Sequence, residues 1–377
     1  MKLKRICALL CCMAVMCTTI ACSDNKVKDE EYNVDDSNND DVIEAAKEDV
    51  VQYLTDGALE SSDTVMTVNG EDVSASYLLY WAASNISDYG YSDASAMDED
   101  NGDGSTIGEE ILNEAKDTAA YYLAIRQQAE ERELALDEDQ QAEVTNYMDS
   151  LDVNSLLYYS TNEDDQKNIY ETYLYSMELQ NTLYGDEGEY TVTDDDLKTY
   201  MGDNEYLTAD YMFFGNSGDT EQAADEALQR AQEVYDTIKN VDEDEFENVF
   251  AEEQENADVS ETDHTFYVGG GEDEKFANGV ADLDIGETAL IQSDSGVYIA
   301  HRKELNTDSI KEECAYNLFY EQLDSWSEEA KVDTNSNYDK IDITQFCEKL
   351  LTLQNAITET ENAESETTED TTNVSNE

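Results

Sequence analysis

Apolar residues recur every three to four positions through most of the chain between residues 74 and 185. This spacing places them on one face of a helix and predicts a series of amphipathic helices. The pattern is carried by three stretches: Tyr77 to Ile86, Ile111 to Ala129 and Ile169 to Leu183. A short apolar run, Val65 to Val68, precedes them and leads into Asn69-Gly70, which indicates a strand and a tight turn. We therefore expect a mostly helical domain over residues 63–195.

A period of two replaces the helical period further along the chain. Tyr206 to Phe214 is a strand-like run, and Gly286 to Arg302 contains two short alternating runs around an Asp-Ser-Gly turn. Such a pair of runs is typical of a β-hairpin. Two helical segments and the glycine-rich turn Gly269 to Gly271 lie between these strands. The elements predict a compact α+β unit of about 100 residues, a normal domain size, over residues 196–305.

The pattern becomes helical again after this unit. Ser309 to Lys331 places apolar residues on one side of a predicted helix, and we assign residues 306–353 to a C-terminal helical segment. The stretch from 354 to 377 is rich in Thr, Glu and Asn and shows no apolar period. We therefore expect residues 354–377 to be a disordered tail.

The first 22 residues have the features of an export signal. Basic residues at the start are followed by a short apolar run and then by Thr19-Ile20-Ala21 before Cys22. This order predicts a signal peptide over residues 1–21 instead of a membrane span. Small residues before a cysteine are similar to the bacterial lipobox, so we expect a lipid on Cys22 that anchors the protein at the extracytoplasmic face of the cell membrane. Ordinary cleavage, with Cys22 incidental, is the alternative.

Acidic residues dominate the composition. The chain has 92 Asp and Glu against 20 Lys and Arg, which gives a formal net charge of −72. A surface of this charge repels nucleic acid phosphates, so nucleic-acid binding is excluded. It attracts cations and basic polypeptide segments, although solubility alone also accounts for it. Residues 22–62 share this acidic character and are expected to form a tether, which contains an amphipathic helix from Asp41 to Leu54.

The order of elements and several short motifs resemble the PrsA/SurA-like extracytoplasmic foldases, which carry a parvulin-type peptidyl-prolyl isomerase domain. The similar segments are Ala209 to Phe213, Glu221 to Lys239, Asp244 to Phe246, Gly269 to Gly271, Lys275 to Ala277, Leu283 to Glu287 and Ser295 to Ile299. The strand, Val-Asn-Gly turn and helix near residue 68 also resemble the start of the foldase N-terminal domain.

This resemblance implies an α+β protein. Its mostly helical chaperone domain is completed by a C-terminal helix from residues 306–353, and its parvulin-like domain has a four-stranded antiparallel sheet. The partners implied are unfolded or nascent secreted proteins, with no cofactor. Dimerisation through the helical domain is left open.

The resemblance also locates a candidate site. The family pattern has histidines in the first and last strands of the domain, where this chain has Tyr211 and Tyr298. A tyrosine hydroxyl both donates and accepts a hydrogen bond, as imidazole does. The substrate-binding walls are expected to be apolar: Met212, Phe213, Phe266, Phe276 and Leu290. Two interpretations stay open, namely residual isomerase activity and a domain that has lost it.

The chain has only two histidines. His301 is three residues from Tyr298, and this odd spacing on a strand points it to the opposite face of the sheet. His264 precedes the glycine turn. It lies either near the expected substrate-binding groove or on the surface as a lone exposed residue.

Two further features have structural alternatives. Glu99, Asn101, Asp103, Gly104 and Glu110 match EF-hand spacing, but the first ligand is Glu instead of Asp, so an acidic loop between helices is favoured and no metal is predicted. The two cysteines outside the N-terminal segment, Cys314 and Cys347, form a disulfide or remain as thiols.

The sequence thus predicts a membrane-anchored extracytoplasmic folding factor that binds unfolded secreted polypeptides, with peptidyl-prolyl isomerase activity placed in doubt by the two tyrosines. The alternative is a non-catalytic structural or cation-binding surface lipoprotein on the same scaffold.

Overall fold

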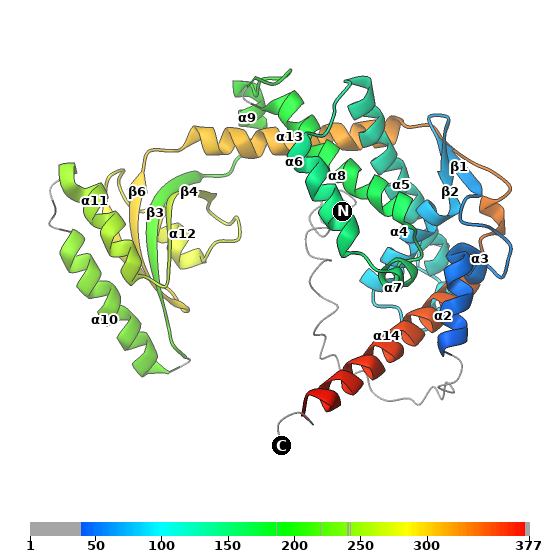
Figure 1. The fold of residues 1–377 in the computed structure, drawn as a ribbon. Coiled ribbons are helices and arrows are strands. Elements are labelled where there is room, and N and C mark those ends of the chain that lie inside the picture. The colour runs from blue at the N-terminus through cyan, green and yellow to red at the C-terminus, as the bar shows by residue number, and fades with distance from the viewer. Residues whose placement is uncertain (1–38, 186, 219, 240, 242, 374–377) are drawn as a thin grey trace. The chain divides into compact units, whose positions relative to one another are not determined.

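The computed structural model describes residues 39–185, 187–218, 220–239, 241 and 243–373. The chain divides into two compact units, the first formed by Met1–Gly188 with Phe319–Glu377 and the second by Glu189–Leu318. Figure 1 shows the elements of both. The predicted signal peptide and the lipid site at Cys22 lie outside the described residues. Within the described ranges, no helix is long and apolar enough to cross a membrane.

The first unit is mostly helical. Its helices are α2 (Asn39–Glu48), α3 (Val50–Leu54), α4 (Ala75–Asp88), α5 (Ile107–Glu131), α6 (Glu138–Ser150), α7 (Val153–Tyr158), α8 (Glu163–Tyr184), the end of α13 (Thr307–Glu329) and α14 (Ile343–Asn373), with 3-10 turns η3 (Ala94–Asp98) and η5 (Tyr338–Lys340). Strands β1 (Thr64–Val68), β2 (Glu71–Ser74) and β7 (Val332–Thr334) form an antiparallel sheet in the order β2-β1-β7.

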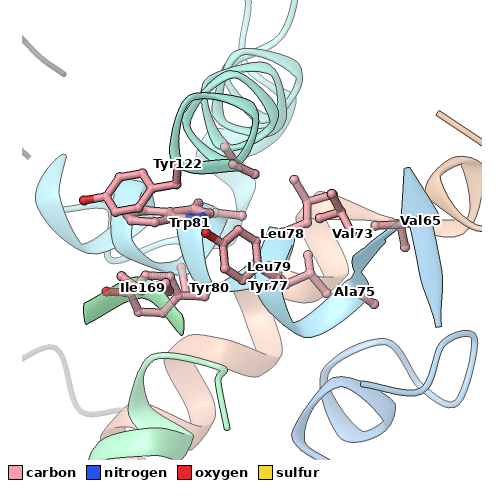
Figure 2. Close-up of a cluster of buried hydrophobic side chains, with 14 of the residues drawn as sticks. Val65, Val73, Ala75, Tyr77, Leu78, Leu79, Tyr80, Trp81, Tyr122 and Ile169 are labelled. Carbon is pink, nitrogen blue, oxygen red and sulfur yellow. The ribbon is translucent and has the colours of Figure 1, made fainter. Parts of the chain in front are cut away.

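Helix α4 is the centre of the first unit. Every residue from Ala75 to Ile86 is buried, so this helix has no solvent-facing side over three turns. Trp81 packs on Tyr122 of α5 with ring centroids 4.6 Å apart, and Figure 2 shows the surrounding side chains from β1, β2 and α8. The tyrosines of α5 therefore belong to the core, where their large rings supply much of the buried apolar area.

A hairpin turn ties the C-terminal part of the chain to the first unit. Asn69 and Gly70 both have positive φ, 52° and 90°, as the Asn-Gly motif predicts for a two-residue turn. The backbone N–H of Asn69 donates to the carbonyl of Lys331 at 2.9 Å, and the Asn69 side-chain oxygen accepts from the Lys331 N–H at 2.9 Å. Strand β7 then pairs with β1, so a three-residue strand from the C-terminal segment completes the sheet.

The two ends of this unit differ from the expected tether and tail. The helix expected from Asp41 to Leu54 is present as α2 and α3, and it buries Ile43, Val51 and Leu54 in the core instead of forming part of a tether. The expected disordered tail instead continues α14 to Asn373. Apolar spacing explains the first turn of this extension, because Phe346, Leu350, Leu353 and Ile357 follow one helix face and are all buried.

The second unit is built on one antiparallel sheet. Its elements are α9 (Asp194–Met201), β3 (Tyr206–Gly215), α10 (Glu221–Ile238), α11 (Glu243–Glu253), η4 (Gln254–Asn256), β4 (Val259–Tyr267), α12 (Glu274–Ala281), β5 (Thr288–Gln292), β6 (Gly296–Lys303) and the start of α13. The strand order is β4-β3-β6-β5, with every neighbouring pair antiparallel. The predicted α+β class with a four-stranded antiparallel sheet is confirmed.

Helices cover both faces of this sheet. Helices α10 and α11 pack on one face, where Met212, Phe214 and Ile299 meet Ala231 and Phe250. The short helix α12 covers the other face, where Phe276, Ala277 and Val280 meet Leu207, Ala209, Tyr211 and Ala300. Figure 1 shows α10 and α11 together on one side of the strands and α12 on the other.

We expect Leu350→Ala to destabilise the first unit strongly, because Leu350 of α14 is fully buried and contacts the core of a unit formed by residues distant in sequence. Truncating a buried leucine costs about 2–5 kcal/mol of unfolding free energy. The exposed neighbour Glu348 is a matched control, and Glu348→Ala should change stability by less than about 0.5 kcal/mol. Urea unfolding measures both. Equal, small effects would show that α14 is not part of the core.

Candidate functional site

Alternation along β3 decides which side chains face α12. Tyr211 and Phe213 point to the α12 side, whereas Met212 and Phe214 point to the α10 side, because successive strand residues face opposite ways. Tyr298 on β6 is paired directly with Phe213 and therefore lies on the same side. The two tyrosines that occupy the expected histidine places are thus brought together, with their ring centroids 5.9 Å apart.

Aromatic rings from four elements of the second unit, β3, β4, β6 and α12, meet on this side of the sheet. We call this set the aromatic face: Tyr211, Phe213, His264, Phe266, Phe276 and Tyr298. Phe276 of α12 lies at the centre, 5.2 Å from Tyr211, 5.2 Å from Phe266 and 4.6 Å from Tyr298. The Phe213 and Tyr298 rings are also 4.6 Å apart. Most of these pairs are edge-on or tilted, which the charge distribution of aromatic rings favours.

The aromatic face has a buried floor and a more accessible edge. Phe276 is 1 % exposed, Phe266 6 % and Tyr211 9 %. Phe213, Tyr298 and His264 are only half-buried. A ligand can therefore reach the three half-buried rings directly, while the other three hold them in position.

A β-bulge brings two polar side chains to this face. Ala209 pairs with His264 and Tyr211 pairs with Glu261, so one residue of β3 lies opposite two residues of β4 between these pairs. Asp263, in the bulge, has a φ of 55°, and its N–H donates to the Asp210 carboxylate at 2.7 Å. The extra residue re-aims the strand. Glu261 and His264 therefore face the same way despite their odd spacing.

His264 lies between two carboxylates. Its Nδ1 is 2.6 Å from Glu261 Oε2, and its Nε2 is 3.0 Å from Glu272 Oε1 beside the glycine turn. Each ring nitrogen is therefore within hydrogen-bonding distance of one carboxylate. The two carboxylates lie on opposite sides of the imidazole and do not converge with it on one point. Among the described residues, no group of three or more potential ligands could hold a metal ion.

The environment keeps both tyrosines protonated at neutral pH. Burial raises the pKa of Tyr211, and the carboxylates of Glu261, to which it is hydrogen-bonded, and Glu272 raise it further. Burial also raises the pKa of Tyr298, with further contributions from Asp273 and Glu272. Both hydroxyls are therefore neutral hydrogen-bonding groups, and neither is a phenolate.

Two of the predicted substrate-binding residues lie elsewhere. Met212 is fully buried and packs against α10 and α11, and Leu290 packs in the same cluster. The register explains this, because Leu290 pairs with Ile299 and Ile299 pairs with Met212, so all three face the α10 side. Phe213, Phe266 and Phe276 are on the aromatic face as expected, although the last two form its floor.

The histidines occupy opposite faces of the sheet. His301 lies on the α10 side, as its odd spacing from Tyr298 predicts, with its ring 4.4 Å from that of Phe246. Its Nδ1 is 2.8 Å from the Thr288 hydroxyl. His264 lies at the edge of the aromatic face, so it is not a lone exposed residue. Sequence analysis missed its partners Glu261 and Glu272, since nothing in the sequence pattern marks the bulge.

The EF-hand-like stretch is a turn that leads into α5. Asp103 accepts from the N–H and hydroxyl of Ser105, and Asp100 accepts from the N–H of Gly102. Thr106 and Glu109 form a capping box at the start of α5. The carboxylates thus satisfy local donors, which supports the acidic-loop interpretation. Cys314 and Cys347 are both buried thiols.

The first unit has a separate groove of about 410 Å³. Its walls come from the α2–α3 junction, the loop at Ser61, helix α7 and the start of α8, and they mix apolar Val50, Leu156 and Leu157 with charged Lys47 and Glu163. No described residue from outside the first unit lines it. Sequence analysis did not identify this groove.

Comparison with known proteins gives structural matches only. No family model matches the chain, and no curated protein sequence does. The foldase protein PrsA from Lactococcus lactis is 14% identical, with a TM-score of 0.34 over 73% of this chain and 96% of that one. PrsA from Bacillus subtilis is 16% identical, with a TM-score of 0.28 over 63% and 90%. The peptidylprolyl isomerase PrsA from Bacillus anthracis is 17% identical, with a TM-score of 0.21 over 64% and 94%. Similarities of this size do not by themselves assign the chain to a family.

We predict that His301 makes the second unit less stable in acid. Burial lowers the pKa of His301 below its ordinary value of 6.5. Below that pH the unfolded chain takes up a proton that the folded state resists, so the contribution of His301 to stability is present above pH 6.5 and lost as pH falls.

His301→Gln removes this titration. Urea unfolding at a series of pH values should show wild type losing stability relative to the variant as the pH falls through this range. Because the two proteins share all other titrating groups, a difference that does not change with pH would contradict the prediction.

Proposed function

We propose that this chain is an exported, lipid-anchored protein-folding factor of the PrsA-like type, which binds unfolded secreted polypeptides. The observation that carries the proposal is the aromatic face, where half-buried Phe213, Tyr298 and His264 lie over a rigid aromatic floor. The signal-like first 21 residues and Cys22 support export and anchoring.

The aromatic face suits an extended polypeptide better than a small molecule. Its accessible rings lie along the edge of a packed cluster, and their backbone comes from β3, β4 and β6. Aromatic rings offer a large contact area with few rotatable bonds, so binding to them costs little conformational entropy. Such a surface accepts many apolar side chains without demanding one sequence, which is what a factor with many clients requires.

Binding is proposed as the main activity, with prolyl isomerisation slow or absent. Isomerisation of an X-Pro bond needs a site that favours the twisted amide over the planar one. Tyr211 is 9 % exposed and belongs to the buried floor of the aromatic face, so a bound peptide has little access to its hydroxyl. Of the two tyrosines, Tyr298 is the accessible one. Its single hydroxyl does not reproduce the pair of hydrogen-bonding groups that two histidines would supply.

We expect the chain from Ser23 onward to suppress the aggregation of a chemically denatured model protein at equimolar ratio. Phe213→Ala and Tyr298→Ala should each raise the amount needed for half suppression, by about fivefold if either ring is a central anchor. Tyr190→Ala removes an exposed tyrosine of the same unit outside the aromatic face and is the control. Light scattering gives the measurement. No suppression at any ratio would contradict the folding-factor proposal and favour a structural surface lipoprotein.

A protease-coupled prolyl isomerase assay tests the catalytic part of the proposal. The chain from Ser23 onward should not measurably accelerate the isomerisation of a short proline peptide. Without a catalyst this isomerisation takes roughly 10–100 s. Tyr211→Phe and Tyr298→Phe should leave this result unchanged. Acceleration by the parent that falls in both variants would instead identify a working isomerase in which tyrosines act in the histidine places.

A further inference from the structure

Carboxylates surround the accessible edge of the aromatic face. Glu261 and Glu272 contact the two nitrogens of His264, and their side chains are 48 % and 36 % exposed. Asp273, next to Glu272, caps the start of α12 through the N–H groups of Lys275 and Phe276. Glu272 contacts His264, whose ring lies 5.4 Å from that of Tyr211, and the Tyr211 ring lies 5.9 Å from that of Tyr298. We call Glu261, Glu272 and Asp273 the acidic rim.

Basic side chains of the protein do not neutralise the main charges of this rim. Within the described part of the chain, no lysine or arginine forms an ion pair with Glu261 or Glu272. The nearest lysine in sequence, Lys275, pairs with Asp294 at 2.5 Å, and Lys303 pairs with Asp263 at 2.5 Å. His264 is therefore the one basic side chain, among the described residues, that contacts Glu261 or Glu272, and the rim keeps a negative excess.

The carboxylates of the acidic rim are held beside the aromatic rings by specific features of the fold, which distinguishes them from the other acidic residues of the surface. Glu261 and His264 face the aromatic rings only because of the bulge, which the buried Asp210 holds through the Asp263 N–H. Glu272 follows the glycine turn that leads into α12. An aromatic ring beside carboxylates that outnumber their basic partner attracts a cation in two ways, through the ring quadrupole and through the negative charges.

We propose that the aromatic face selects basic segments of unfolded polypeptides, with a lysine or arginine side chain placed against Tyr298 and beside the carboxylates of the acidic rim. The proposal rests on the proposed function and specifies its substrate class. The long stem of a lysine or arginine covers apolar surface while its charged end reaches the carboxylates. A bare metal ion fits this arrangement poorly, because the carboxylates lie on opposite sides of the imidazole and do not converge.

The test compares three fluorescent peptides of equal length that differ at one position: Lys-Phe-Pro, Gln-Phe-Pro and Glu-Phe-Pro in the same neutral context. Binding to the chain from Ser23 onward is measured by fluorescence anisotropy. The expected order of affinity is lysine, then glutamine, then glutamate, with the lysine peptide favoured over the glutamine peptide by about fivefold at low salt. This preference should shrink as ionic strength rises.

Charge-removing variants locate the preference. Glu272→Gln should reduce the ratio of lysine to glutamine affinity about two- to threefold. Glu233→Gln, on the exposed side of α10, removes one charge elsewhere in the same unit and should not alter the ratio. Urea unfolding confirms that both variants are folded.

The outcomes separate this inference from the function on which it rests. Equal binding of all three peptides would overturn the charge selection and leave the folding-factor proposal standing. A similar loss in Glu272→Gln and Glu233→Gln would also overturn it, because net charge alone would then explain the attraction. Failure of every peptide to bind, together with no suppression of aggregation, would overturn the proposed function itself.

Discussion

The alternation of side chains along β3 is the constraint on which the second unit depends. This central strand pairs with β4 on one side and β6 on the other. The face on which each β3 side chain lies therefore sets the face of its paired residues in β4 and β6. Met212 and Phe214 lie on one face of the sheet, where they pack against α10 and α11. The opposite face then receives Tyr211 and Phe213, and with them Tyr298 and Phe276. A shift of one residue would exchange the two faces.

A single bulge modifies this alternation where polar chemistry is needed. Asp210 points away from Tyr211, yet its carboxylate holds the Asp263 N–H and so fixes the bulge. Glu261 and His264 reach the aromatic face as a result. The proposed binding surface therefore depends on a buried carboxylate that does not belong to it. A single side chain has a comparable role in the first unit. Asn69, in the tight turn after β1, accepts a hydrogen bond from the N–H of Lys331, and the chain that follows Lys331 pairs with β1 as β7.

Sequence patterns predicted those features of the fold that depend only on residues close together in the chain. The parity of residues 298 and 301 placed Tyr298 and His301 on opposite faces, and the Asn-Gly motif predicted the positive φ values at 69 and 70. The same parity rule would have removed Met212 from the predicted walls, and the helical spacing of Leu353 and Ile357 would have extended α14. The partners of His264 were beyond such rules, because the bulge depends on a contact between residues 53 apart.

The central claim is that the aromatic face of the second unit binds unfolded polypeptide. Hydrogen–deuterium exchange of the chain from Ser23 onward, with and without a permanently unfolded client, tests it most directly. The account predicts slower exchange in the client-bound state at residues 259–276, which contain β4, the glycine turn and the start of α12, and at residues 296–300 of β6. Client binding with no change in these segments, and with protection confined to the first unit, would contradict it.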